Sequence, residues 1–331
     1  MMYPTLEQIK FIISLIHIYK QVFRYFPIFL LFFGTIGNLM SCSVFLQRTL
    51  RKNPCAIYFL AASIANIIYL ATLTSLMLDA WDETLNLMGT ISGMCKFTML
   101  IIMISRTLSL WFIVLATIDR YLISSPDQNQ RQMNNLKGCY RSIIIVSAFA
   151  LALWAEAIYC FDANLINTPI KCYTISNACR LYNDITLALM SIIIPSMVML
   201  VFGGLTIRNI HQSRQRMHPS MSVTVAVPTR SRKTEQNFTR MLLTQVFLII
   251  VLNLPQAIFT FYLTMIFEQP KTLMQNVVNG FIFNILLLFP FISCCISFLL
   301  YTLSGKIFRQ ALVRVTKRMI NFFLTCHRRH S

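Results

Sequence analysis

The sequence predicts an all-α membrane protein built as a bundle of seven transmembrane helices. Its 331 residues are 56% hydrophobic and 12% charged, whereas about a quarter of the residues in an ordinary soluble domain carry charge. The apolar residues also gather into seven runs, each long enough for the about 20 residues that a spanning helix needs. These runs must be helical, because lipid offers a backbone no hydrogen-bond partner.

Short polar segments separate the runs, so each run is expected to form its own helix. The predicted spans are Tyr25 to Leu46, Cys55 to Leu78, Ser92 to Ile123, Ser142 to Phe161, Tyr182 to Ile207, Thr239 to Phe267 and Leu273 to Leu303. The segment before the first span is amphipathic at best, and Glu7, Lys10 and Lys20 interrupt it. We therefore expect no cleaved signal peptide.

The distribution of charge predicts how the chain is oriented in the plasma membrane. Most of the 29 Lys and Arg residues lie after the first, third, fifth and seventh spans, and such residues accumulate in the cytoplasm. Acidic residues are enriched on the opposite side, among them Asp79, Asp82, Glu83, Asp184 and Glu268. The net charge of +18 therefore favours an anionic inner leaflet of the bilayer rather than nucleic acid.

This orientation divides the chain into three parts. We expect an extracellular amino terminus over residues 1–24, the seven-helix region over 25–303, and an amphipathic eighth helix with a cytoplasmic tail over 304–331. In the tail, Cys326 lies close enough to the membrane to be acylated, and an unmodified thiol is the equal alternative.

The third span carries the strongest motif of the sequence. It begins with Cys95 and ends with Asp119, Arg120 and Tyr121. This pairing resembles the rhodopsin-like (class A) G-protein-coupled receptors. Further residues lie in order where the family pattern places them, namely Gly37 and Asn38, Trp154, Pro195, Pro255, Tyr301 and, as the turn into an eighth helix, Ser304 to Arg309.

Three positions depart from that pattern. Asn66 stands where the family usually has an Asp, which puts sodium binding in doubt although Ser109 lies nearby. Asn253 replaces the usual Trp of the sixth span, and Ser297 and Phe298 replace the Asn-Pro pair of the seventh. Because these positions concern activation in the family, the resemblance implies a divergent receptor whose switch uses different contacts.

The resemblance also implies a disulfide that joins Cys95 to the second outer loop, where Cys172 and Cys179 are both candidates. The sequence leaves the choice between them open. Free thiols are favoured for Cys42, Cys160, Cys294 and Cys295.

Arg120 is the candidate for coupling to a partner in the cytoplasm. The family pattern implies that its guanidinium pairs with Asp119 and with Glu235, at the inner end of the sixth span. The alternative is that Glu235 is simply solvated beside neighbouring basic residues. Pro255 weakens a backbone hydrogen bond and bends the sixth helix, which allows its inner end to move.

The candidate ligand contacts are Ile102, Arg106, Glu156 and Phe291. Arg106 lies deep in the third span, where an ionisable group is costly unless it is paired or wetted. It either faces a ligand cavity between the third, fifth, sixth and seventh helices or forms a buried ion pair with Glu156. Ile102 and Phe291 stand where amine and light-sensing family members carry an Asp and a Lys, which argues against those ligands. A peptide ligand, as in neuropeptide receptors, is favoured because the outer rim is acidic and wide.

Together these observations predict a receptor that binds an extracellular peptide and activates a heterotrimeric G protein by outward movement of its sixth helix. A polytopic transporter is the alternative, although the two halves show no related pattern of broken helices. We expect neither enzymatic activity nor a cofactor or metal, since the five His residues lie outside the spans or at their margins.

Overall fold

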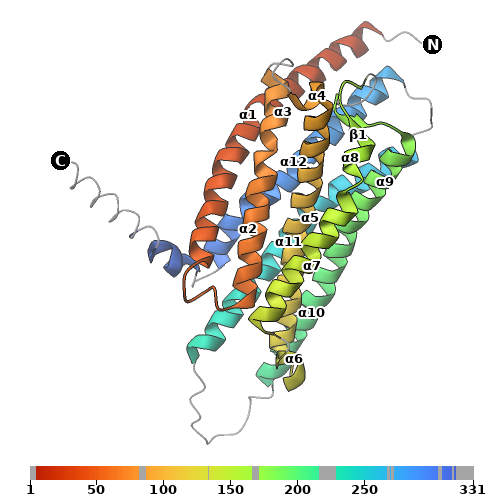
Figure 1. Ribbon diagram of the computed structural model, residues 1–331. Coiled ribbons are helices and arrows are strands. Elements are labelled where there is room, and N and C mark those ends of the chain that lie inside the picture. The colour runs from red at the N-terminus through yellow and green to blue at the C-terminus, as the bar shows by residue number, and fades with distance from the viewer. Residues whose placement is uncertain are drawn as a thin grey trace, which may run out of the picture.

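The computed structural model describes residues 5–81, 87–132, 134–165, 171–215, 229–266, 269, 272–304, 308–314 and 317. Within these residues, seven helical segments are long and apolar enough to cross a membrane. They are Leu6–Phe45, Pro54–Ser75, Ser92–Ser124, Leu136–Cys160, Asn177–Gln212, Leu242–Met265 and Leu273–Leu303. The long helices run side by side as one bundle (Figure 1), which confirms the predicted fold class.

Several of these segments consist of more than one element. The elements in chain order are α1 Leu6–Phe45, α2 Pro54–Ala71, α3 Leu73–Trp81, α4 Leu87–Thr90, α5 Ser92–Ser124, α6 Gln128–Gln132, α7 Leu136–Trp154, α8 Ala157–Cys160, β1 Phe161–Asp162, β2 Tyr173–Thr174, α9 Asn177–Ala188, a π-helical turn Leu189–Ile193, α10 Ile194–Gln215, α11 Thr229–Met265 and α12 Leu273–Ser304. Figure 1 shows β1 at one end of the bundle and α6 at the other. We refer to these as the β1 end and the α6 end.

Helix α5 is the central element of the bundle. It packs against α2, α7 and α10, while α11 pairs with α12 and α1 closes the arrangement against α2 and α12. The position of α5 explains why its residues are unusually buried, including polar ones such as Thr107, Ser109 and Arg120. Polar side chains in this helix therefore meet other helices rather than lipid.

Helix α1 begins at Leu6, well before the predicted start at Tyr25. Thr5 and Gln8 form a capping box, in which each side chain accepts a hydrogen bond from the other residue's backbone N–H. At 1.5 Å per residue, the 40-residue helix is about 60 Å long, roughly twice the hydrocarbon core of a bilayer. Its amino-terminal part projects beyond the other helices at the β1 end (Figure 1).

Asparagine caps set the starts of two other helices. The Asn53 side chain accepts a hydrogen bond from the Cys55 backbone N–H at 3.0 Å, and Pro54 occupies the first turn of α2. The Asn135 side chain accepts from the Gly138 backbone N–H at 2.6 Å, so α7 begins at Leu136 instead of the predicted Ser142. In both cases a polar residue outside the apolar run begins the helix.

Two disulfides lie at the β1 end. Cys95, near the start of α5, is bonded to Cys172, which resolves the choice that the sequence left open. Cys179 is bonded to Cys160, so the prediction of a free Cys160 thiol is wrong. That prediction counted Cys160 as part of an apolar span, whereas the residue ends α8 immediately before the β1–β2 hairpin.

The hairpin is also tied to the start of α5 by a carboxylate. Asp162 accepts a hydrogen bond from the Ala163 backbone N–H at 2.8 Å and another from the Ser92 side chain. These hydrogen bonds, led by that from Ser92, hold the pKa of the Asp162 carboxyl below its ordinary value. Together with the Cys95–Cys172 disulfide, they fix the hairpin against the central helix.

At the α6 end, residues 308–314 form a short helix after α12. Its buried Phe308 packs against Phe45 and Tyr301, with ring centroids 5.5 and 5.7 Å apart. The Gln47 side chain donates to the Ala311 carbonyl at 2.9 Å. The predicted acylation site Cys326 lies outside the described residues.

Candidate functional site

A buried charged cluster lies at the α6 end of α5. The Arg120 guanidinium donates to the Asp119 carboxylate through Nη2 at 2.6 Å and through Nε at 3.1 Å. The Arg120 side chain is only 1% exposed and that of Asp119 6%. Because both charged groups are buried away from water, their mutual attraction is screened much less than it would be on the protein surface.

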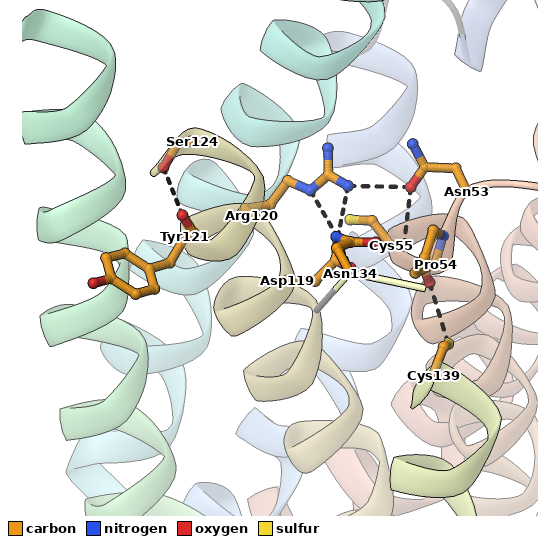
Figure 2. Close-up of polar contacts among 9 residues, drawn as sticks. All are labelled: Asn53, Pro54, Cys55, Asp119, Arg120, Tyr121, Ser124, Asn134 and Cys139. Carbon is orange, nitrogen blue, oxygen red and sulfur yellow. Dashed lines mark hydrogen bonds and ion pairs between the residues drawn. The ribbon is translucent and has the colours of Figure 1, made fainter. Parts of the chain in front are cut away.

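Two asparagines from other segments complete this cluster, as Figure 2 shows. Asn53, the cap of α2, accepts a hydrogen bond from Arg120 Nη2 at 3.1 Å. Asn134, which precedes α7, donates to the other Asp119 oxygen at 2.6 Å. The ion pair thereby joins α5 to the start of α2 and to the segment before α7, and we call Asn53, Asp119, Arg120 and Asn134 the arginine cluster.

Tyr121 points away from the arginine cluster, toward α10 (Figure 2). Its ring meets that of Phe202 edge-on, with centroids 5.2 Å apart. Ser124 donates to the Tyr121 carbonyl at 3.0 Å and accepts from Asn209 of α10 at 3.3 Å. Asp119, Arg120 and Tyr121 therefore contact three different parts of the chain, namely the segment before α7, the cap of α2 and helix α10.

Glu235, the second predicted partner of Arg120, lies within α11, but its side chain is outside the described part of the chain. The side chains of the predicted outer acids Asp79, Asp82, Glu83 and Glu268 also lie outside the described part of the chain. Asp184 is described. It lies 3.6 Å from Arg180, one turn earlier in α9.

A polar network crosses the middle of the bundle. Asn38 of α1 donates to the Cys294 carbonyl of α12 at 3.2 Å, and it accepts from Asn66 of α2 at 3.2 Å. Ser109 of α5 donates to the Asn66 side-chain oxygen. Four helices are thus connected by three predicted residues, all of them buried.

A second network surrounds Trp154 at the end of α7. The indole donates to the Thr107 hydroxyl at 2.9 Å, and that hydroxyl lies 2.9 Å from Ser191 in the π-helical turn. Pro195 follows this turn within α10. A turn of this kind places an extra residue in the helix, which here brings Ser191 against α5.

Of the predicted switch residues in α11 and α12, Ser297 is bonded to the opposite helix, through Gln245, which no sequence motif singled out. Gln245 of α11 donates to Ser297 of α12 at 3.4 Å. Asn253 donates to the Ile249 carbonyl of its own helix at 2.8 Å, two residues before Pro255. Tyr301 is almost fully buried, with its ring 5.1 Å from that of Phe59.

Two of the predicted ligand contacts lie together in an apolar cluster. Phe291 of α12 stacks on Tyr69 of α2 with ring centroids 4.1 Å apart and an interplanar angle of 2°. Ile102 of α5 packs against the same cluster. The structure therefore places Ile102 and Phe291 at the same apolar cluster, which also contains Tyr69, a residue that no sequence motif singled out.

Arg106 and Glu156 are not joined. Arg106 Nη2 donates to the side-chain oxygen of Gln256 in α11 at 2.7 Å, and its Nε has no hydrogen-bond partner. Both carboxylate oxygens of Glu156 are buried without a hydrogen-bond partner. The predicted alternative of an ion pair between these residues is not formed.

Sequence reasoning missed the partners that complete these sites, namely Asn53, Tyr69, Thr107, Asn134, Ser191 and Gln256. Asn53 had a local signal, since an Asn before a Pro is typical of a helix start. The others are recognised only by what they contact across the bundle. Among the described residues, no group of three His, Cys, Asp or Glu side chains lies close enough to hold a metal ion.

Comparison with known proteins agrees with this arrangement. A family model described as "7 transmembrane receptor (rhodopsin family)" matches residues 37–301. Human CX3C chemokine receptor 1 is 31% identical over 126 residues, which cover 38% of this chain and 32% of that receptor. The matched stretch is thus about a third of each protein. Because the family model covers most of the chain, from α1 to the end of α12, the protein belongs to the rhodopsin family of seven-transmembrane receptors.

Proposed function

We propose that this receptor binds an extracellular peptide at the β1 end and activates a heterotrimeric G protein at the α6 end. The observation that carries this proposal is the arginine cluster, in which a fully charged side chain is buried at one end of the central helix. The guanidinium is held by Asp119 of its own helix and by Asn53 at the start of α2, so it is available to a new partner only after these contacts are broken.

The proposed ligand site lies between α5, the α9–α10 segment, α11 and α12, at the end that carries the two disulfides. We propose Ile102 and Phe291 as contacts on the α2 side of this site, because Phe291 belongs to an apolar cluster of α1, α2, α3 and α12 against which Ile102 of α5 packs. A peptide is favoured by the acidic residues on the predicted outer side and by the likeness to a receptor named for a chemokine.

The proposed transmission needs no chemical step. A ligand that binds better to the conformation with α11 moved outward increases the population of that conformation. Pro255 lacks the N–H that would continue the hydrogen-bond ladder of α11, so this helix bends more easily there. We propose that Arg120 then leaves Asp119 and contacts the G protein, and that Glu235 is a further partner of Arg120 in the inactive conformation.

The experiment is a cell assay that reads activation of each G-protein class while a peptide library is applied. The wild type, Arg120→Ala and the matched control Arg141→Ala are compared at equal surface expression; Arg141 is an exposed arginine of α7. We expect at least one peptide to activate the wild type and Arg141→Ala, with the Arg120→Ala response reduced about tenfold or more. Absence of activation by any peptide, together with solute flux in vesicles, would contradict the proposal.

A further inference from the structure

A small polar cavity lies in the middle of the bundle, lined by residues of α2, α5, α11 and α12. Its polar lining consists of Asn66, Arg106, Ser109, Asn253, Ser293 and Ser297, together with Gln245. The cavity measures about 20 Å³. Since about 10–15 Å³ is enough for one water molecule, it has room for a water or a small ion.

Among the described lining residues, Arg106 is the one with a charged side chain. The Arg106 side chain is 5% exposed, and its Nε has no hydrogen-bond partner. Its contact with Gln256 satisfies one donor but supplies no charge, because an amide is neutral. A buried cation without a counter-ion is strongly disfavoured unless another group neutralises it.

The described carboxylates do not neutralise Arg106. Asp119 is bonded to Arg120, Asp184 lies beside Arg180, and Glu156 makes no hydrogen bond. Among the described residues, neither an Asp nor a Glu lines the cavity. The positive charge next to the cavity therefore has no counter-ion among the side chains that the structure describes.

The amide groups of the lining still have donors to offer. Asn66 uses one side-chain N–H on Asn38, and Asn253 uses one on the Ile249 carbonyl, so each retains a second N–H. The unpartnered Gln245 oxygen is an acceptor and would favour a water or a cation instead. A full guanidinium charge outweighs one amide dipole at such distances, so the cavity favours a negative occupant.

We propose that this cavity binds one chloride ion as the counter-ion of Arg106. Chloride is little larger than water and accepts hydrogen bonds from guanidinium and amide N–H groups. The carboxylate of a peptide fits less well, because it would bring its own chain into a space of about 20 Å³. This inference concerns the ligand-free protein and does not depend on the proposed signalling function.

The test is thermal unfolding of the purified full chain in detergent at constant ionic strength. Sodium chloride, choline chloride, sodium gluconate and choline gluconate are compared, so that anion and cation effects separate. At a chloride concentration tenfold above its Kd, we expect both chloride salts to raise the melting temperature by about 2 °C, with saturation. A shift that follows sodium instead of chloride, or no shift at all, would overturn the proposal.

Two variants and one control identify the site. Arg106→Gln should lose the chloride response, whereas Arg141→Gln, at an exposed arginine, should keep it. Asn66→Asp places a carboxylate in the lining and should make the melting temperature independent of chloride. Retention of the chloride response in Arg106→Gln would refute the site. If that variant does not fold, Asn66→Asp decides alone, because a full chloride response there excludes the cavity.

Discussion

At the scale of single residues, the arginine cluster contains the contacts with the clearest consequences. The pair of Asp119 and Arg120 was predictable from the sequence, because the two residues are adjacent and stand at the end of an apolar run. Asn134 was not predictable as a partner, since its hydrogen bond to Asp119 depends on how the segment before α7 returns to α5. The charged pair can thus be recognised in the sequence, whereas the side chains that bond to it are known only from the fold.

Asn134→Ala should raise G-protein activation in the absence of ligand. The change removes a hydrogen bond to a charged group, and such bonds contribute about 1.5–3 kcal/mol, so the equilibrium constant for release should increase about tenfold or more. Basal activation is measured in cells at equal surface expression. Asn129→Ala, at an exposed position of α6, is the matched control and should equal the wild type. Equal basal activity of both variants would argue against a restraining role of Asn134.

At the scale of helices, the apolar runs predicted which segments cross the membrane but not where the helices begin. An apolar run shows which part of a helix can lie in lipid. The start of the helix is set instead by capping residues, such as Thr5 before α1 and Asn135 before α7. The sequence likewise does not show which helices pack closely against one another. A Cβ on Gly37 would lie 2.9 Å from Cβ of Phe298, a proximity of α1 and α12 that only the structure reveals.

Gly37→Ala should therefore destabilise the bundle. The added methyl meets a side-chain atom next to the α12 backbone that has little freedom to move, and overpacking of this kind costs about 1–3 kcal/mol. Gly204→Ala in α10 is the matched control, because nothing lies within 4 Å of its added Cβ; we expect it to stabilise by about 0.5–1 kcal/mol. Thermal unfolding in detergent measures both. Equal melting temperatures for the two variants would mean that α1 and α12 are not this close.

The second disulfide gives a prediction about the β1 end. Cys160 and Cys179 are 19 residues apart and join the end of α8 to α9, so their bond constrains a short loop of the unfolded chain. Replacing both by Ser should lower the free energy of unfolding by about 3 kcal/mol in the chain-entropy model. Peptide mapping without reduction gives the direct check. A Cys95–Cys179 crosslink in the wild type would contradict the observed pairing.

At the scale of the whole molecule, the charges of the loops predict an orientation that the bundle itself does not encode. The described residues contain seven candidate spans, an odd number, so we predict that the two termini lie on opposite sides of the membrane. An epitope tag at the amino terminus should be stained on intact cells, and a tag at the carboxyl terminus only after permeabilisation. Staining of both tags on intact cells would refute the topology.

The central claim is that burial of Arg120 beside Asp119 keeps the receptor inactive and that release of Arg120 activates a G protein. The most direct measurement is basal G-protein activation by Asp119→Asn, with and without Arg120→Ala, at equal surface expression. The account predicts that Asp119→Asn raises basal activation about tenfold and that the double variant loses this gain, because the released guanidinium is what the G protein binds. Basal activation of Asp119→Asn equal to that of the wild type, or a gain that survives the loss of Arg120, would contradict it.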